Sequence, residues 1–258
     1  MPVRSIIFAL LLASATAGCA SAQGASSTIP DAPQPQNHSS DQVTIASTPR
    51  HILSDQLAIW SSPAHLNESN AAGPVLLVLA TAVVITTDHQ MMSEEVPIDT
   101  SLNNHAVTAS NGLTGGFIAA PAIIYGLGHI HHDDHATETG ILGGEAMADS
   151  LAVDEVLKLV SLRERPAVDG ARGKFFQTSV GLDSSFPSTH SFIAWSSAAV
   201  IASEYDGLLT QITAYGLATG VSATRVLGRQ HFPSDVLVGS AVGWMIGRYV
   251  VHHRRRLD

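Results

Sequence analysis

Apolar residues recur along most of the chain at the three- and four-residue spacing of amphipathic helices. Alternating β-branched stretches bounded by hairpin turns, which would indicate strands, are not evident. The pattern predicts helices at 53–60, 75–87, 113–127 (interrupted by Pro121), 137–165, 191–203, 208–224 and 234–251. We therefore expect an all-α protein folded as a helical bundle.

The last predicted helix carries Gly239, Gly243 and Gly247 at four-residue intervals, so one stripe of it has no side chains. A neighbouring helix can approach such a stripe closely, either in a soluble bundle or in a bilayer. A membrane span needs about eighteen or more apolar residues in a row, and no uncharged apolar run of that length is apparent. We therefore expect a soluble or peripherally attached domain.

The N-terminus resembles an export signal, covering residues 1–22, with Arg4 before an apolar run and then small residues. Residues 16–19 (Thr-Ala-Gly-Cys) resemble a bacterial lipobox, in which Cys19 is lipidated, whereas cleavage after Ala22 would suit ordinary signal peptidase. Cys19 is the only cysteine of the chain, which favours the lipoprotein. We expect a protein exported to the bacterial cell envelope, in the periplasm, and held to a membrane by this lipid anchor.

Residues 23–50 are rich in Ser, Pro, Ala, Asn and Gln and predict a disordered linker. Residues 51–258 are enough for one folded domain. The net charge of -9 argues against nucleic-acid binding, and both lysines and nine of the eleven arginines lie from Lys158 onward. A basic pocket in an acidic protein suits the capture of a phosphate ester.

Three short motifs carry candidate chemistry. The first places Arg225 six residues before His231 and Asp235 four residues after it. If a helix begins near His231, the histidine and the carboxylate share one face, and the carboxylate can fix the tautomer of a nucleophilic imidazole. Taken alone, the motif is better explained by a capped helix start with a surface His-Asp contact.

The other two motifs supply more cations and an anion site. Lys158 and Arg165 are seven residues apart, about two turns along one face of a helix that Pro166 would end. Ser188 is the expected N-cap of a helix that begins just before His190, and the free N–H groups of a helix start bind anions.

The order Lys-x6-Arg-Pro, Pro-Ser-x-His, Arg-x5-His-x3-Asp resembles the type 2 phosphatidic acid phosphatase (PAP2) superfamily, which includes bacterial acid phosphatases and vanadium haloperoxidases. The resemblance covers residues 158–235. It implies a helical bundle of the PAP2/haloperoxidase type. It also implies a metal-independent phosphatase without a cofactor that hydrolyses phosphomonoesters or lipid phosphates and diphosphates through a phosphohistidine.

The resemblance also assigns roles to individual residues. His231 would be the nucleophile, Asp235 its orienting partner, and His190 the acid that protonates the leaving oxygen. The groups that would hold the phosphoryl oxygens are Lys158, Arg165, Ser188, the backbone N–H of Thr189, and Arg225.

Two departures from the family pattern leave alternatives open. Thr189 stands where the family usually has glycine, which allows positive φ, and its hydroxyl would be an additional donor. Thr224 replaces a serine and keeps the hydroxyl.

Two alternative functions stay open. A vanadate-dependent haloperoxidase would use the same pocket, with His231 coordinating vanadate. A catalytically silent anion-binding module is the other alternative, supported only by Thr189.

Two further stretches have two readings each. Residues 129–135 (His-Ile-His-His-Asp-Asp-His) could bind a divalent metal, but we expect Asp133 or Asp134 to cap a helix there and no metal to bind. Phe175 and Phe176 lie in a glycine-containing loop. They would either form the mouth of the pocket or plug the end of the bundle.

Overall fold

The computed structural model describes residues 43–67 and 69–255 of the chain. In this part it contains no strand, so the predicted all-α class is confirmed. The α-helices are α2 (Thr48–Ser61), α3 (Ala72–Gln90), α4 (Thr100–His131), α5 (Asp134–Ser161), α6 (Thr189–Glu204), α7 (Leu208–Leu227) and α8 (Pro233–Arg255). Four short turns of helix are η1 (Ser62–His65), η2 (Met91–Glu95), η3 (Asp169–Ala171) and η4 (Gly181–Asp183).

The predicted export signal, with Cys19, and residues 23–42 of the predicted linker lie outside the described residues. The predicted domain boundary at 51 falls inside α2, which begins at Thr48. Val43 is already buried and joins a core cluster with α5, α6 and α8. The folded unit therefore starts earlier than the composition indicated.

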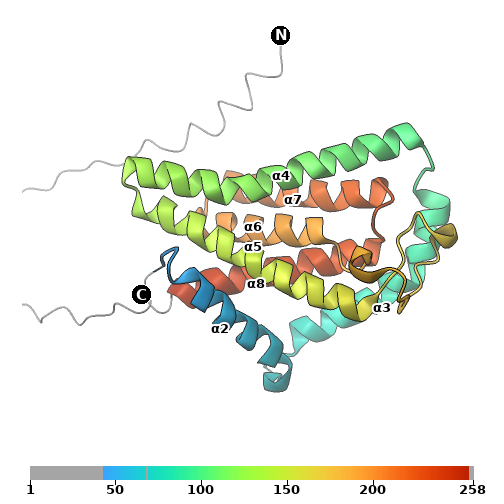
Figure 1. The fold of residues 1–258 in the computed structure, drawn as a ribbon, viewed down its shortest axis with the longest axis horizontal. Coiled ribbons are helices and arrows are strands. Elements are labelled where there is room, and N and C mark those ends of the chain that lie inside the picture. Colours follow the sequence, from blue (N-terminus) through green and yellow to red (C-terminus); the bar gives the residue numbers. More distant parts are fainter. Residues whose placement is uncertain (1–42, 68, 256–258) are drawn as a thin grey trace, which may run out of the picture. The chain divides into compact units, whose positions relative to one another are not determined.

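Helix α6 is the centre of the bundle and packs against α4, α5, α7 and α8 (Figure 1). Phe192 and Val200 on one side of α6 join the core cluster shared with α5 and α8. Ile193 and Ala198 on another side join a second cluster with α4 and α7. A helix surrounded by others is buried nearly all round, and this fixes α6, whose first turn enters the site, in position.

The glycine stripe of α8 is what lets α8 approach α6. A Cβ atom on Gly243 would lie 2.6 Å from the Phe192 carbonyl oxygen, and one on Gly247 would lie 2.4 Å from the Ser196 carbonyl oxygen. No real side chain fits at those distances. The stripe predicted from the sequence therefore packs against α6.

Helix α4 runs through Pro121 without a break, so the predicted interruption is wrong. Pro121 is buried against α5, where Gly140 and Gly143 leave room for it. A Cβ on Gly143 would lie 2.8 Å from the Pro121 Cγ. A proline weakens a helix locally, but tertiary packing on both sides of the residue holds this one together.

Helix α5 ends earlier than predicted, at Ser161, because Leu162 adopts a left-handed conformation with φ 44°. Arg165 therefore lies in the loop after the helix. The prediction that Lys158 and Arg165 share one helical face is wrong, and the two cations reach the site from different elements.

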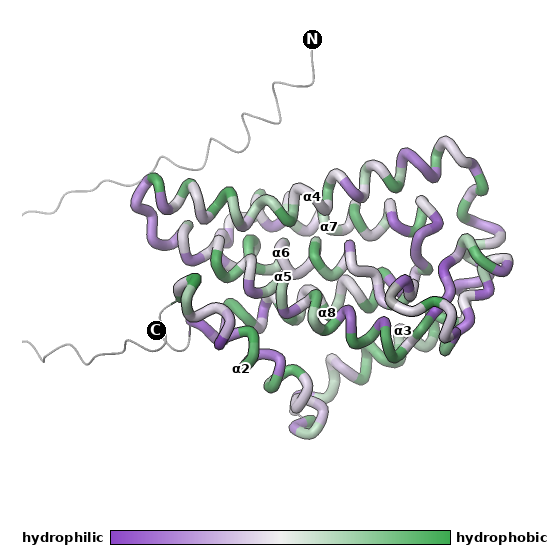
Figure 2. Tube along the Cα trace, in the orientation of Figure 1, coloured by the Kyte–Doolittle hydropathy of each residue, from purple (hydrophilic) through white to green (hydrophobic). Residues whose placement is uncertain are grey.

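Two helices are long and apolar enough to cross a membrane, which corrects the expectation drawn from uninterrupted apolar runs. They are Ala72–Glu95, with mean hydropathy 1.5, and Thr100–His131, with mean hydropathy 1.4. Only 11% and 22% of their apolar windows are buried inside the protein, and apolar residues recur along both (Figure 2). Uncharged Thr, Asn and Gly residues interrupt the apolar runs without adding a charge, and this concealed their length.

Candidate active site

The three motifs meet at one end of the bundle, where α5 and α7 end and where α6 and α8 begin (Figure 1). Lys158 is in the last turn of α5 and Arg225 in the last turn of α7. His190 is in the first turn of α6, and His231 lies in the turn that leads into α8. Residues separated by up to 77 positions in the sequence thus belong to one site.

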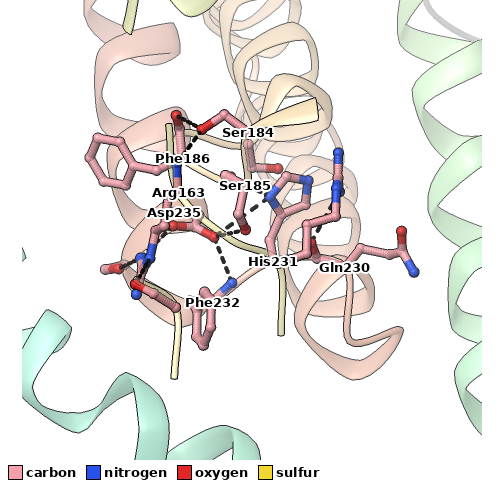
Figure 3. A network of polar contacts seen from close by, with 12 residues as sticks. Arg163, Ser184, Ser185, Phe186, Gln230, His231, Phe232 and Asp235 are labelled. Carbon is pink, nitrogen blue, oxygen red and sulfur yellow. Dashed lines mark hydrogen bonds and ion pairs between the residues drawn. The ribbon is translucent and has the colours of Figure 1, made fainter. Parts of the chain in front are cut away.

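His231 is oriented by a backbone carbonyl. Its Nδ1–H donates to the Ser185 carbonyl oxygen over 2.7 Å (Figure 3). This bond fixes the tautomer and leaves the lone pair on Nε2. Burial lowers the pKa of His231, only partly offset by Asp235, so the ring is neutral and suited to act as a nucleophile.

Asp235 lies beside His231, and its role as orienting partner stays a prediction. Its Oδ2 lies 3.7 Å from the Nδ1 of His231, which is too long for a hydrogen bond. Helix α8 starts only at Pro233, so the i, i+4 geometry of a helix does not apply between the two residues. Asp235 instead accepts from the Ser185 hydroxyl at 2.5 Å and the Phe232 N–H at 2.8 Å. It holds the two segments that carry and orient the histidine.

Arg163, to which the sequence motifs assigned no role, supports the arrangement of Asp235 and His231. Its guanidinium donates to Asp235 Oδ1 over 2.6 Å and to Asp88 Oδ2, on α3, over 2.7 Å. It lies 4.6 Å from the ring centre of Phe175 and 4.0 Å from that of Phe232. Phe175 therefore packs on the guanidinium that supports the site. The neighbouring Phe176 is 72% exposed.

His190 is linked to α4, which lies outside the three motifs. Its Nε2–H donates to the Asn111 side-chain oxygen over 3.0 Å, and Arg225 Nη1 approaches the same oxygen at 3.4 Å. Burial lowers the pKa of His190 to about 3. The further causes, in order, are the nearby groups Arg225, His231, Arg165 and Lys158. The predicted acid, His190, therefore lies close enough to the predicted cations for their charges to affect its pKa.

The cations near the two histidines include a buried donor without a hydrogen-bond partner. Arg225 is buried, its Nη1 donates to the Ser110 hydroxyl over 3.2 Å, and its buried Nε–H has no partner. Arg165 is held by Asp183 at 2.9 Å and by the Gln230 carbonyl at 3.1 Å. A buried guanidinium with an unused donor is suited to bind a phosphoryl oxygen.

Ser188 caps α6, as predicted, and its side chain accepts from the Ser191 N–H. Thr189 is the first residue of α6 and does not need the positive φ that would favour glycine. Its hydroxyl accepts from the Lys158 ammonium at 2.5 Å and donates to Asp154 Oδ2 at 2.7 Å. The hydroxyl is therefore engaged and is not the additional substrate donor that we expected. It positions Lys158 instead.

Replacing Thr189 with valine is expected to lower kcat/KM about 10–100-fold, because valine keeps the shape but leaves Lys158 and Asp154 without their shared hydroxyl. Thr189→Ser should stay within about threefold of the wild type. Steady-state phosphate release by the three proteins measures this. Equal rates for the valine and serine variants would show that the hydroxyl does not position Lys158.

The lowered pKa of His190 predicts a pH-dependent stability. The folded-state pKa of about 3 lies below the ordinary value of 6.5, so the unfolded chain takes up the proton first as the pH falls. The stability due to this residue is complete above pH 6.5 and is lost as the pH falls toward 3. His190→Asn should therefore lose less stability than the wild type between about pH 7 and about pH 5 in thermal unfolding. An equal loss would contradict the assignment.

The histidine-rich stretch at 129–135 divides between two helices. Asp133 caps α5 and accepts from the Ala136 N–H at 3.0 Å, as predicted. His135 Nε2 lies 3.0 Å from Glu204 Oε2 on α6. His132, at the end of α4, adopts a left-handed conformation. The stretch therefore shapes the turn between α4 and α5.

Comparisons with known proteins agree with this geometry. Residues 141–257 match the model of the PAP2 superfamily. The fold is similar to the crystal structure of the first transmembrane PAP2 type phosphatidylglycerolphosphate phosphatase from Bacillus subtilis, with 22% identity and a TM-score of 0.54 over 72% of this chain and 97% of that one. No curated protein sequence matches the chain. Residues 141–257, which contain the three motifs, are therefore similar to the PAP2 superfamily.

Proposed function

We propose that this protein is a membrane-associated phosphatase that removes phosphate from lipid phosphate esters through a phosphohistidine on His231. The observation that carries the proposal is the bond from His231 Nδ1 to the Ser185 carbonyl, which leaves Nε2 as the nucleophile beside a cluster of cations. Phosphatase-type function itself is supported by the family match and the similar fold.

In the first step, Nε2 of His231 attacks phosphorus in line, and the bond between phosphorus and the ester oxygen breaks. Protonated His190 gives its proton to that oxygen as it leaves. His190 is neutral in the free protein because four neighbouring groups and burial lower its pKa. A phosphate dianion bound among the same cations offsets their field and allows the histidine to become protonated.

In the second step, neutral His190 takes a proton from water, the water oxygen attacks phosphorus, and the bond to His231 breaks. Arg225, Arg165 and Lys158 stabilise the charge that spreads over the phosphoryl oxygens in both steps. These side chains, together with the N–H groups at the start of α6, supply the electrostatic stabilisation that a metal ion supplies in other phosphatases. We therefore propose that the reaction needs no metal and no cofactor.

The membrane-type helices favour a lipid substrate, because both of them contact the site. Asp88 of α3 pairs with Arg163, and Ser110 and Asn111 of α4 bond to Arg225 and His190. A phosphate headgroup at the surface of a bilayer would thus meet the pocket at the same end of the bundle. The similar structure is that of a phosphatase for a phosphorylated phospholipid. Export and lipidation of Cys19 stay predictions.

The full chain, purified in a mild detergent with EDTA present, tests the function directly. We expect phosphate release from short-chain phosphatidate and from phosphatidylglycerophosphate, with kcat/KM at least about tenfold higher than for p-nitrophenyl phosphate. Equal values for all three esters would argue for a general phosphatase. Absence of turnover by the folded chain, with halide oxidation in the presence of peroxide and vanadate, would contradict the proposal.

A further inference from the structure

A second cluster of ionisable side chains lies far from the active site. Asp55 on α2 and Glu145 and Asp149 on α5 are fully buried, and one oxygen from each lies within 4.8 Å of the others. Arg254 of α8 contacts two of them. Arg254 is nineteen residues along α8 from Asp235, so about 28 Å separates this cluster from the active site.

Each aspartate is held through one of its oxygens, and Glu145 is held through both. Arg254 donates to Asp55 Oδ2 at 2.6 Å and to Glu145 Oε1 at 2.6 Å. Gln56 donates to Asp149 Oδ1 at 2.8 Å, and His51 Nδ1 lies 3.3 Å from Glu145 Oε2. These bonds leave the second oxygens of both aspartates without a hydrogen-bond partner, although both atoms are shielded from solvent.

The charges of the cluster do not balance. Three carboxyl groups face one guanidinium, so their full ionisation would leave two negative charges in excess when His51 is neutral. Buried carboxylate oxygens with neither a donor nor a counter-charge are costly, and natural proteins seldom keep them without a ligand.

We propose that Asp55, Glu145 and Asp149 bind a hard divalent cation, with Ca²⁺ preferred over Mg²⁺ and Mn²⁺. The available ligands are all oxygens, which suits these ions. Opposite ligands around Ca²⁺ lie about 4.6–5.2 Å apart, and those around Mg²⁺ about 4.0–4.2 Å apart. Separations of up to 4.8 Å are compatible with either ion, and Ca²⁺ is preferred because it accepts irregular oxygen geometry whereas Mg²⁺ demands a near-ideal octahedron.

The proposed ion would fasten α2 to the bundle. Asp55 is on α2, the first helix of the described chain, whereas the other two ligands are on α5. The ion balances two negative charges, so it stabilises the folded chain without taking part in phosphate chemistry.

The test is calcium binding by the full chain in detergent after removal of metals with EDTA. Equilibrium dialysis should show one Ca²⁺ per chain, and about 1 mM Ca²⁺ should raise Tm by about 5 °C, with a smaller rise in Mg²⁺ or Mn²⁺. Asp149→Asn should reduce the calcium response to below about 1 °C. In EDTA this variant should be as stable as the wild type or more stable, because it removes a buried excess charge.

Asp206→Asn, which removes an exposed carboxylate between α6 and α7, is the matched control and should keep the full calcium response. Asp55→Asn provides a second ligand variant if Asp149→Asn does not fold. The proposal is overturned if the folded wild type binds none of the three ions at about 1 mM, or if both ligand variants respond to calcium as the wild type does. Binding is measured without turnover, so its failure is distinguishable from a failure of the phosphatase assay.

Discussion

Replacing His231 with alanine is expected to lower kcat for phosphate release at least about 10⁴-fold, because the side chain forms the covalent intermediate and no other group can replace it. The fold should survive, since the change removes a buried ring but leaves the Ser185 loop bonded to Asp235. Phosphate release by the variant and circular dichroism of the same sample measure the two expectations.

A trapping experiment separates loss of the nucleophile from general damage. Brief reaction with ³²P-labelled substrate should label the wild type at an acid-labile, alkali-stable site, and His231→Ala should take up no label. His190→Ala should gain label slowly and lose it slowly, because it lacks both the acid of the first step and the base of the second. His252→Ala is the matched control, since His252 is exposed on the last turn of α8 and far from the site. Labelling of the His231 variant would contradict the mechanism.

Replacing Arg163 with methionine is expected to lower the free energy of unfolding by about 3–5 kcal/mol. The guanidinium is 2% exposed and neutralises two buried carboxylates, so the variant leaves Asp88 and Asp235 without their common counter-charge. It also loses the stacking of Arg163 between two phenylalanine rings. Chemical denaturation of the variant in detergent, or its thermal unfolding, measures the loss.

Arg172→Met is the matched control, because its side chain is 65% exposed and its nearest carboxylate, on Asp169, lies 3.9 Å away. It should change the free energy of unfolding by less than about 0.5 kcal/mol. The double variant Arg163→Met with Asp88→Asn should recover part of the loss, because it removes one unpaired charge. Equal stabilities of the two single variants would show that Arg163 is not the central support of the site.

The sequence by itself determined the helical class and the chemical groups of the site. Both follow from short stretches of sequence. The spacing of apolar residues predicts helices, and the three motifs contain the cationic residues and histidines of the site. Helix caps at Ser188 and Asp133 followed from the same local rules. The close approach along the glycine stripe of α8 was also readable, because an absent side chain is a property of the sequence.

Contacts between distant segments could not be predicted from local sequence patterns. Ser185 orients His231 across 46 residues, and Asn111 reaches His190 across 79. Every residue has a backbone carbonyl, so the sequence does not indicate which carbonyl will bind a given side chain. A single asparagine on an apolar helix likewise does not indicate its partner. Helix α8 starts at Pro233 rather than at His231, and Asp235 lies 3.7 Å from the ring of His231, beyond hydrogen-bonding distance.

The tertiary structure also decided which apolar residues face inward. Whether α3 and α4 are core helices or candidate membrane spans depends on how much of each is covered by its neighbours, and this is small for both. The tertiary structure also decides which charged residues are buried. Arg163 and Arg172 are the same residue type, yet Arg163 is buried between two carboxylates and Arg172 is exposed. Burial is set by packing between segments far apart in the chain, so it emerges only when the bundle is assembled.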